Sequence, residues 1–240
     1  MRKAALCMLA LVAAASAEPV DEPPERPSWF ARFLPEQIHL GPQMGMTASR
    51  FQATSQYRAM VMPTAANRDA WMSPSYGALI TGRWRKAFTL TLAPRMESYG
   101  MDTREETVYF PENPFPHTLE SSTRTRYLVW PLLLGMGWFG ERRHFQVQLG
   151  TYAAQLQQAE IRWVVDGEPY PNRPGAAQFK KSPAGWIFGI EYGARMGPGT
   201  MLLGLGTQRG FGSLMEGLPG NIKAESAGMN LAYAWRLGGR

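Results

Sequence analysis

Histidines, the side chains that most often act as a general base, are few in this chain. Its 240 residues include three histidines, His39, His117 and His144. A serine hydrolase or acyltransferase needs a histidine within hydrogen-bond reach of its nucleophile. None of the three histidines is flanked by a serine in such a pattern. The sequence therefore predicts no enzyme activity and no catalytic residue.

Metal and cofactor sites are not indicated either. No group of histidine and carboxylate residues has the spacing of metal ligands. The glycine-rich stretch from Gly204 to Gly212 lacks a following Lys-Ser or Lys-Thr pair, so it does not resemble a phosphate-binding loop. We predict no metal site, no cofactor-binding residue and no cofactor.

Polar and charged residues do recur at every second position in several otherwise apolar segments. Successive side chains of a strand point to opposite faces, so such residues share one face. In a closed barrel they would meet in the lumen, where charges of both signs can pair. The predicted luminal polar cluster is Arg95, Glu97, Gln146, Gln148, Glu191, Arg195, Asn230 and Arg236.

The stretch from Tyr127 to Gly150 shows the alternation best. Its two apolar runs are separated by Gly140 to Arg143, a break short enough for a hairpin. In the second run Phe145, Val147 and Leu149 share one face, and glutamines share the other. We interpret the stretch as two membrane-spanning strands joined by a tight turn.

About eight segments have the length and pattern of such strands, although ten strands remain an alternative. They cover roughly residues 38–47, 76–84, 88–99, 127–139, 144–152, 185–196, 200–210 and 227–237. Large apolar side chains occupy one face, while glycine, alanine and polar residues crowd the other, which suits a narrow lumen. The sequence predicts an all-β, closed, antiparallel, up-and-down transmembrane β-barrel.

The connections and aromatic residues agree with this prediction. Short turns alternate with long connections, which are predicted at residues 51–74, 100–122, 160–183 and 211–221. Short periplasmic turns and long extracellular loops are typical of outer-membrane barrels. Aromatic rings are expected to form two girdles at the interfaces. One girdle would contain Trp84, Phe88, Trp138, Phe139, Phe145, Tyr233 and Trp235, and the other Tyr76, Tyr99, Tyr127, Tyr152 and Trp186.

The N-terminal residues predict export. Residues 1–17 combine a basic start, an apolar run and a small-residue cleavage site, which is the pattern of a secretory signal peptide. Residues 18–36 are predicted to be an acidic, proline-rich periplasmic leader, and residues 37–240 the barrel. Cleavage would remove Cys7, so no internal disulfide is expected. The excess of 25 basic over 19 acidic residues is not concentrated in a run, which argues against nucleic-acid binding.

The hairpin resembles that of the PorT-like outer-membrane β-barrel family. That family has a strand of the form Tyr-x-Glu-x-Pro-Leu-Leu, followed by a turn and a strand ending near Gly-x-Tyr. This chain has Tyr127 to Leu134 and Gly150-Thr151-Tyr152, but Val129 replaces the acidic residue. The resemblance implies a small barrel of a Gram-negative cell envelope and says little about its role.

Three functions fit the sequence. The first is an integral outer-membrane barrel with a structural, binding or secretion-associated role. Its partners would be outer-membrane lipid, the barrel-assembly machinery during insertion, and an extracellular ligand or envelope protein of unknown identity. The second is a soluble periplasmic lipocalin-like barrel that binds an apolar ligand. The third is a lipid-modifying outer-membrane barrel enzyme that uses His39 or His144.

Overall fold

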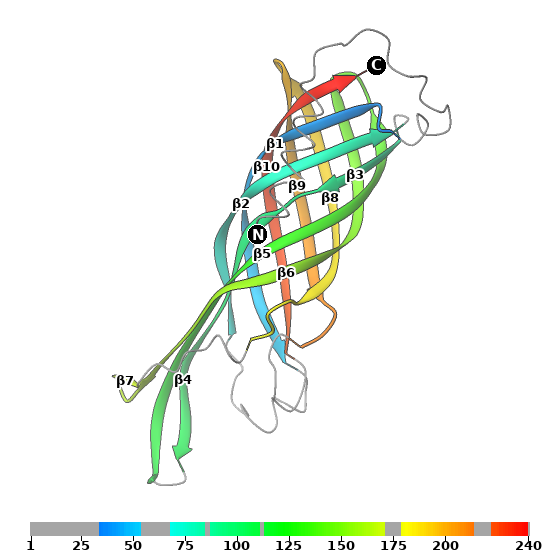
Figure 1. The fold of residues 1–240 in the computed structure, drawn as a ribbon. Helices are drawn as coiled ribbons and strands as arrows, with labels where there is room; N and C mark the ends of the chain where they lie inside the picture. The colour runs from blue at the N-terminus through cyan, green and yellow to red at the C-terminus, as the bar shows by residue number, and fades with distance from the viewer. Residues whose placement is uncertain are drawn as a thin grey trace.

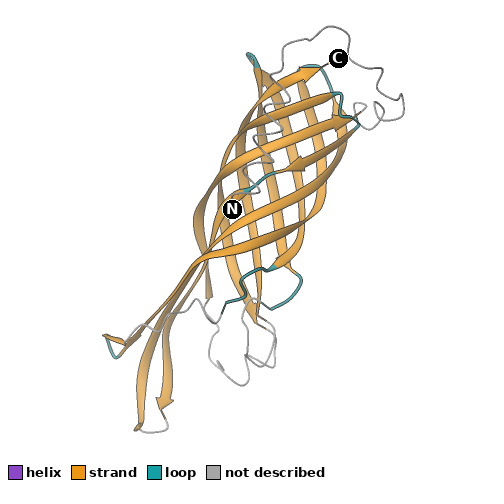
Figure 2. Cartoon of the chain, viewed as in Figure 1, coloured by secondary structure: helices purple, strands orange, loops and turns teal. Residues whose placement is uncertain are grey.

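The structure is a computed structural model that describes residues 34–53, 68–84, 87–110, 113–170, 179–213 and 222–239. The predicted signal peptide and most of the predicted leader lie outside the described residues. The regular elements are ten strands (Figures 1 and 2). They are β1 (Gln37–Ala53), β2 (Arg68–Trp84), β3 (Phe88–Leu92), β4 (Arg95–Phe110), β5 (Asn113–Phe139), β6 (Arg143–Val165), β7 (Glu168–Tyr170), β8 (Ala184–Met196), β9 (Gly199–Gly210) and β10 (Ile222–Gly239).

These strands close into one antiparallel ring. Strands β3 and β4 occupy a single position in it, because both pair with β2 and β5 and are separated only by Ala93 and Pro94. β1 pairs with β10 from Gln37 to Ala53, which joins the first strand to the last. The ring therefore has eight positions, and β7 pairs only with the end of β6. The predicted closed up-and-down barrel of about eight strands is confirmed.

The two faces of the wall are as the alternation predicts. Large apolar side chains point outward and are exposed, and their neighbours point into the lumen, where most are buried. In β6, for example, Leu149 is 60% exposed while Gln146 is 1% exposed. Gly41 of β1 lies where the neighbouring strand β10 approaches closely, because a Cβ atom there would lie 1.9 Å from the backbone oxygen of Tyr233. Only glycine fits at that close approach.

The two ends of the barrel differ in the length of their connections. The tight turns at residues 140–142 and 197–198 lie at the end where β1 begins and β10 ends. We call this the short-turn end. At Gly197 the backbone has φ of 61°, a conformation that glycine adopts without steric cost.

At the opposite end, three strands continue beyond the barrel. The segment from Gly100 to Ser122, predicted to be a loop, instead carries β4 and β5 onward as paired strands as far as Phe110 and Asn113. β6 continues beside β5 to Val165, and β7 returns along it. We call this protruding sheet the extension, residues 103–110, 113–121 and 158–170 (Figure 1, lower left).

Prolines in this segment are typical of a loop, yet the structure accommodates them in a strand. Pro114 and Pro116 lie before Leu119, the first residue of β5 that pairs with β6. One edge of β5 therefore has no strand partner there among the described residues. Proline cannot donate a backbone hydrogen bond, but it is tolerated on such an edge.

The predicted aromatic girdles are only partly present. Trp138, Phe145 and Trp235 are exposed on the outer face at the short-turn end, and Tyr76 is exposed on β2. Phe139 is buried inside, and so are three tyrosines assigned to the other girdle, Tyr99, Tyr127 and Tyr152. The reason is alternation: Tyr99 stands an even number of residues from the inward-facing Arg95 and Glu97, so it points inward with them.

Among the described residues, no helix is long and apolar enough to cross a membrane.

Candidate functional site

The deepest polar group in the lumen is centred on Glu97 of β4, which is 2% exposed. Its carboxylate accepts hydrogen bonds from the Arg95 guanidinium, from the Gln208 amide and from the Tyr99 hydroxyl, the last at 2.7 Å. Gln208 also donates to the Tyr99 hydroxyl oxygen at 2.6 Å. β4 and β9 are not neighbours in the ring, so this network spans the lumen. We call it the deep network.

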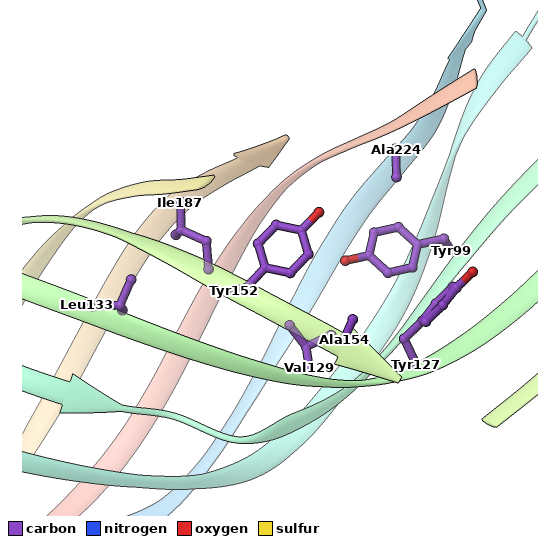
Figure 3. Packing of buried hydrophobic residues seen from close by; sticks show 8 residues of the cluster. All are labelled: Tyr99, Tyr127, Val129, Leu133, Tyr152, Ala154, Ile187 and Ala224. Carbon is purple, nitrogen blue, oxygen red and sulfur yellow. The ribbon is translucent and has the colours of Figure 1, made fainter. Parts of the chain in front are cut away.

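The deep network is bordered by an aromatic cluster on the side of the extension. The rings of Tyr99 and Tyr127 meet edge to face with centroids 5.8 Å apart. Tyr152 and Ile187 belong to the same buried cluster, with their side chains directed into the lumen (Figure 3). Together with the deep network, these side chains fill the middle of the barrel, as expected for a ring of eight strands.

A second polar group, the Glu191 network, lies nearer the short-turn end. Glu191 of β8 accepts a hydrogen bond from Gln146 at 2.6 Å and one from Gln148 at 3.3 Å. The His144 ring nitrogen is also 3.3 Å from this carboxylate. Thr89 of β3 donates to the Gln146 side-chain oxygen at 2.6 Å. Two amide donors and a histidine ring thus surround the half-buried carboxylate of Glu191.

Beyond the Glu191 network the lumen opens into a cavity of about 420 Å³ at the short-turn end. We call it the mouth cavity. Every position of the ring contributes at least one lining residue. Its charged residues are mostly cationic. They are Arg83, Arg142, Arg143, Arg195, Arg236, Glu141 and Glu191, together with His39 and His144.

One wall of the mouth cavity is aromatic. The Phe139 ring stacks on the His144 ring with centroids 5.3 Å apart. The Arg83 guanidinium carbon lies 4.3 Å from the centre of the same phenylalanine ring. A cation over an aromatic face is held electrostatically, so Phe139 orients Arg83 on this wall.

The eight residues of the predicted luminal cluster are divided among different levels of the barrel. Arg95 and Glu97 belong to the deep network, while Gln146, Gln148 and Glu191 form the Glu191 network. Asn230 lines a small cavity of about 50 Å³ beside Arg95, Glu97 and Gln148. Arg195 and Arg236 lie farther out, on the mouth cavity, with exposed side chains.

Sequence reasoning missed three members of these networks. The sequence predicts Tyr99 in a girdle and His144 at a strand end, although each shares the parity of polar residues that it predicts inside. Gln208 is not among the predicted luminal residues. A strict count of every second residue along β4, β6 and β9 would have placed all three in the lumen.

The three histidines have polar partners other than serine. The His39 ring is 3.4 Å from the Gln37 side-chain oxygen, and the His144 ring contacts Glu191. His117 lies in the extension, with its Nδ1 atom 2.5 Å from an Asp166 carboxylate oxygen. Among the residues that the structure describes, no three His, Cys, Asp or Glu side chains come together as metal ligands.

Asp166 occupies the turn between β6 and β7. It has φ of 51° and precedes Gly167, whose φ is 83°. Two consecutive residues with positive φ are typical of a two-residue hairpin turn, and Asp-Gly is a favoured sequence for it. The Asp-Gly pair is thus a turn signal that is visible in the sequence. Hydrogen bonds from His117 and from the Thr118 backbone hold the pKa of Asp166 below its usual range.

Neither a family model nor a curated protein sequence matches this chain. A search of solved structures found small outer-membrane β-barrel proteins, each at low identity. Ail of Yersinia pestis, solved with the heparin analogue sucrose octasulfate, is 8% identical, with a TM-score of 0.39 over 83% of this chain and 99% of that one. OprG from Pseudomonas aeruginosa is 9% identical, with a TM-score of 0.40 over 85% of this chain and 96% of that one. Neisserial surface protein A is 11% identical, with a TM-score of 0.36 over 81% and 95%.

Proposed function

We propose that this chain is an integral outer-membrane β-barrel with a structural, binding or secretion-associated role. The observation that carries the proposal is the outer face of the ring. Apolar side chains are exposed at every position of the ring, among them Met44, Met72, Leu90, Leu134, Leu149, Ile190, Leu205 and Leu231. Patches of this extent are rare on soluble proteins, whereas lipid covers them in a membrane barrel.

The interior supports the same proposal. A soluble lipocalin-like barrel would place apolar residues around its ligand and polar residues on the outside. Here Glu97, Gln146 and Gln148 are buried inside while Met136 and Leu149 are exposed outside. This arrangement is the reverse of the soluble one, so we favour the membrane barrel over the periplasmic ligand carrier. Membership of the PorT-like family and export by a cleaved signal peptide belong to the proposal.

A pore or an enzyme is less well supported than a structural or binding role. The deep network and the aromatic cluster occupy the middle of the lumen, where the described residues leave a cavity of only about 50 Å³. The contacts of His39 and His144 provide no serine nucleophile for the lipid-modifying alternative. A binding role would use either the extension or the mouth cavity.

Fractionation of expressing cells tests the proposal. We expect the chain in the outer-membrane fraction, released by detergent and not by osmotic shock. The folded barrel should run faster than the boiled protein on a denaturing gel, because its closed hydrogen-bonded ring resists the detergent until heated. Recovery in the osmotic-shock fluid without a heat-dependent shift would contradict the membrane assignment and favour the soluble alternative.

A further inference from the structure

We propose that the mouth cavity binds a soluble anion that carries several phosphate groups. The proposal goes beyond the membrane role, because it concerns the inside of the ring and does not depend on what covers the outside. It can therefore be tested on purified protein in detergent, separately from cellular location.

The first argument is charge. Five arginines line the cavity against two glutamates. One of the two glutamates, Glu191, already accepts hydrogen bonds from Gln146 and Gln148 at the cavity floor. A concave wall with charges mainly of one sign focuses the electric field and raises the local concentration of counter-ions. Anions are therefore concentrated in this cavity.

The second argument is the arrangement of the arginines around the ring. Arg236 of β10 stands opposite His39 of β1 in the strand pairing. Arg195 of β8 lies beside the turn that carries Arg142, because its backbone nitrogen donates to the Arg142 carbonyl oxygen at 2.8 Å. Arg83 approaches from β2 over the Phe139 ring. Cations thus face the cavity from several sides, so a compact ligand can contact more than one of them.

The chemistry of the lining favours phosphate. The planar guanidinium group presents paired donors that match phosphate oxygens, and a phosphate monoester carries nearly two negative charges. The hydroxyl-bearing residues Thr81 and Thr200 also line the cavity and add neutral donors. A volume of about 420 Å³ is within the range of small-ligand sites. Several cations around one small volume favour a ligand with several negative charges close together.

The position of the cavity favours a soluble ligand over a lipid headgroup. The cavity lies inside the ring, whereas the outer face at this level carries the exposed apolar residues Trp138, Phe145 and Trp235. A lipid on that face would have to reach over the rim to place its phosphate among the arginines. A water-soluble anion enters directly from the open end.

The test is calorimetric titration of the full chain, purified in an uncharged detergent, with sodium tripolyphosphate. We expect saturable binding that weakens as salt is added. The double variant Arg195→Gln, Arg236→Gln should bind about tenfold more weakly or worse, since hydrogen bonds to charged groups are lost. The matched control is Arg162→Gln, which removes one positive charge from an exposed side chain in the extension and should leave binding unchanged.

A variant that is expected to tighten binding rules out misfolding as the cause of weaker binding. Glu141→Gln removes a negative charge from the turn beside the cavity and should tighten binding roughly two- to threefold. Absence of saturable binding, or equal weakening by Arg162→Gln, would overturn the proposal. So would binding of phosphatidylglycerol, measured in mixed micelles, that depends on Arg195 and Arg236 while tripolyphosphate does not bind.

Discussion

Glu97 illustrates how a charged residue is kept inside this barrel. Arg95 supplies the opposite charge two residues along the same strand, and Tyr99 and Gln208 donate hydrogen bonds to the carboxylate. A buried ion pair adds little net stability when complete, because desolvation offsets the attraction. Removing one partner is different, since the other charge is then left without compensation.

We therefore predict that Glu97→Leu lowers the free energy of unfolding by about 3–5 kcal/mol, because Arg95 stays buried without its carboxylate. The double variant Arg95→Met, Glu97→Leu should regain part of this loss. Urea unfolding of the barrel in detergent, followed by tryptophan fluorescence, measures both. The control is Glu160→Gln, which breaks an exposed ion pair with Arg162 and should cost less than about 1 kcal/mol. Equal losses for Glu97→Leu and the control would contradict the prediction.

At the scale of the element, the extension contains a turn with contacts to a neighbouring strand. Asp166 and Gly167 reverse the chain between β6 and β7, and the turn is tied to β5 by hydrogen bonds in both directions. The Asp166 amide donates to the Thr118 carbonyl at 2.9 Å, and the Thr118 amide donates to the Asp166 carboxylate at 2.8 Å. The turn therefore links three strands beyond the support of the barrel.

We predict that Asp166→Ala loosens the extension and leaves the barrel intact. Alanine loses the carboxylate contacts and pays about 1–2 kcal/mol for the left-handed backbone conformation. Asp166→Asn should have a smaller effect, because asparagine tolerates that conformation and retains an acceptor oxygen. Amide hydrogen exchange should accelerate at Thr118 in the alanine variant and remain slow in the strands of the ring. Faster amide exchange throughout the ring would contradict the prediction, because it would show that the extension and the barrel do not open independently.

The hydrogen bonds of Asp166 also predict that the stability of the extension depends on pH. Because the folded-state pKa of Asp166 is lowered, first by the hydrogen bond with His117, its contribution to stability is fully present above the pKa of a free aspartate, near 3.9. It is lost as pH falls through the lowered folded-state value. Protection of Thr118, corrected for the intrinsic exchange rate, should therefore persist to about pH 4 and decline below it. The Asp166→Asn variant should lack this decline.

At the scale of the whole molecule, the barrel is a closed ring with an apolar exterior and a polar interior. This arrangement is the reverse of that in a soluble barrel. It is stable only if lipid or detergent covers the exterior, because exposed apolar area is unfavourable in water. Substitutions on the exterior therefore test the membrane role of the barrel without reference to any ligand.

We predict that Leu205→Arg, near the middle of β9, destabilises the barrel in lipid vesicles by about 2–4 kcal/mol. Leu237→Arg, near the end of β10 at the short-turn end, should cost about 0–1 kcal/mol, because a charge there reaches the interface. Both leucines are exposed, at 49% and 42%. On a soluble barrel both substitutions would be nearly neutral. Urea unfolding of vesicle-reconstituted protein distinguishes these outcomes.

Much of the fold could be predicted because the alternation of strand faces is a local property. Inward and outward positions in β1, β3, β6, β8 and β10 follow from counting every second residue, whatever the neighbouring strands are. The same count places Tyr99, Tyr127 and Tyr152 inside, so at these positions alternation overrides the preference of tyrosine rings for the interface. The extension could not be predicted from composition, because its prolines lie on an edge that only the sheet pairing reveals.

The sequence by itself determined the strand content of the barrel wall, the faces of most strands and which polar side chains enter the lumen. Only the tertiary structure decided the level at which each luminal residue lies. Strands in a closed barrel are tilted and staggered, so residues on opposite walls meet at heights that no local pattern encodes. Glu97 and Gln208 thus share one network across the lumen, while Arg195 and Arg236, with the same inward parity, lie out at the mouth cavity.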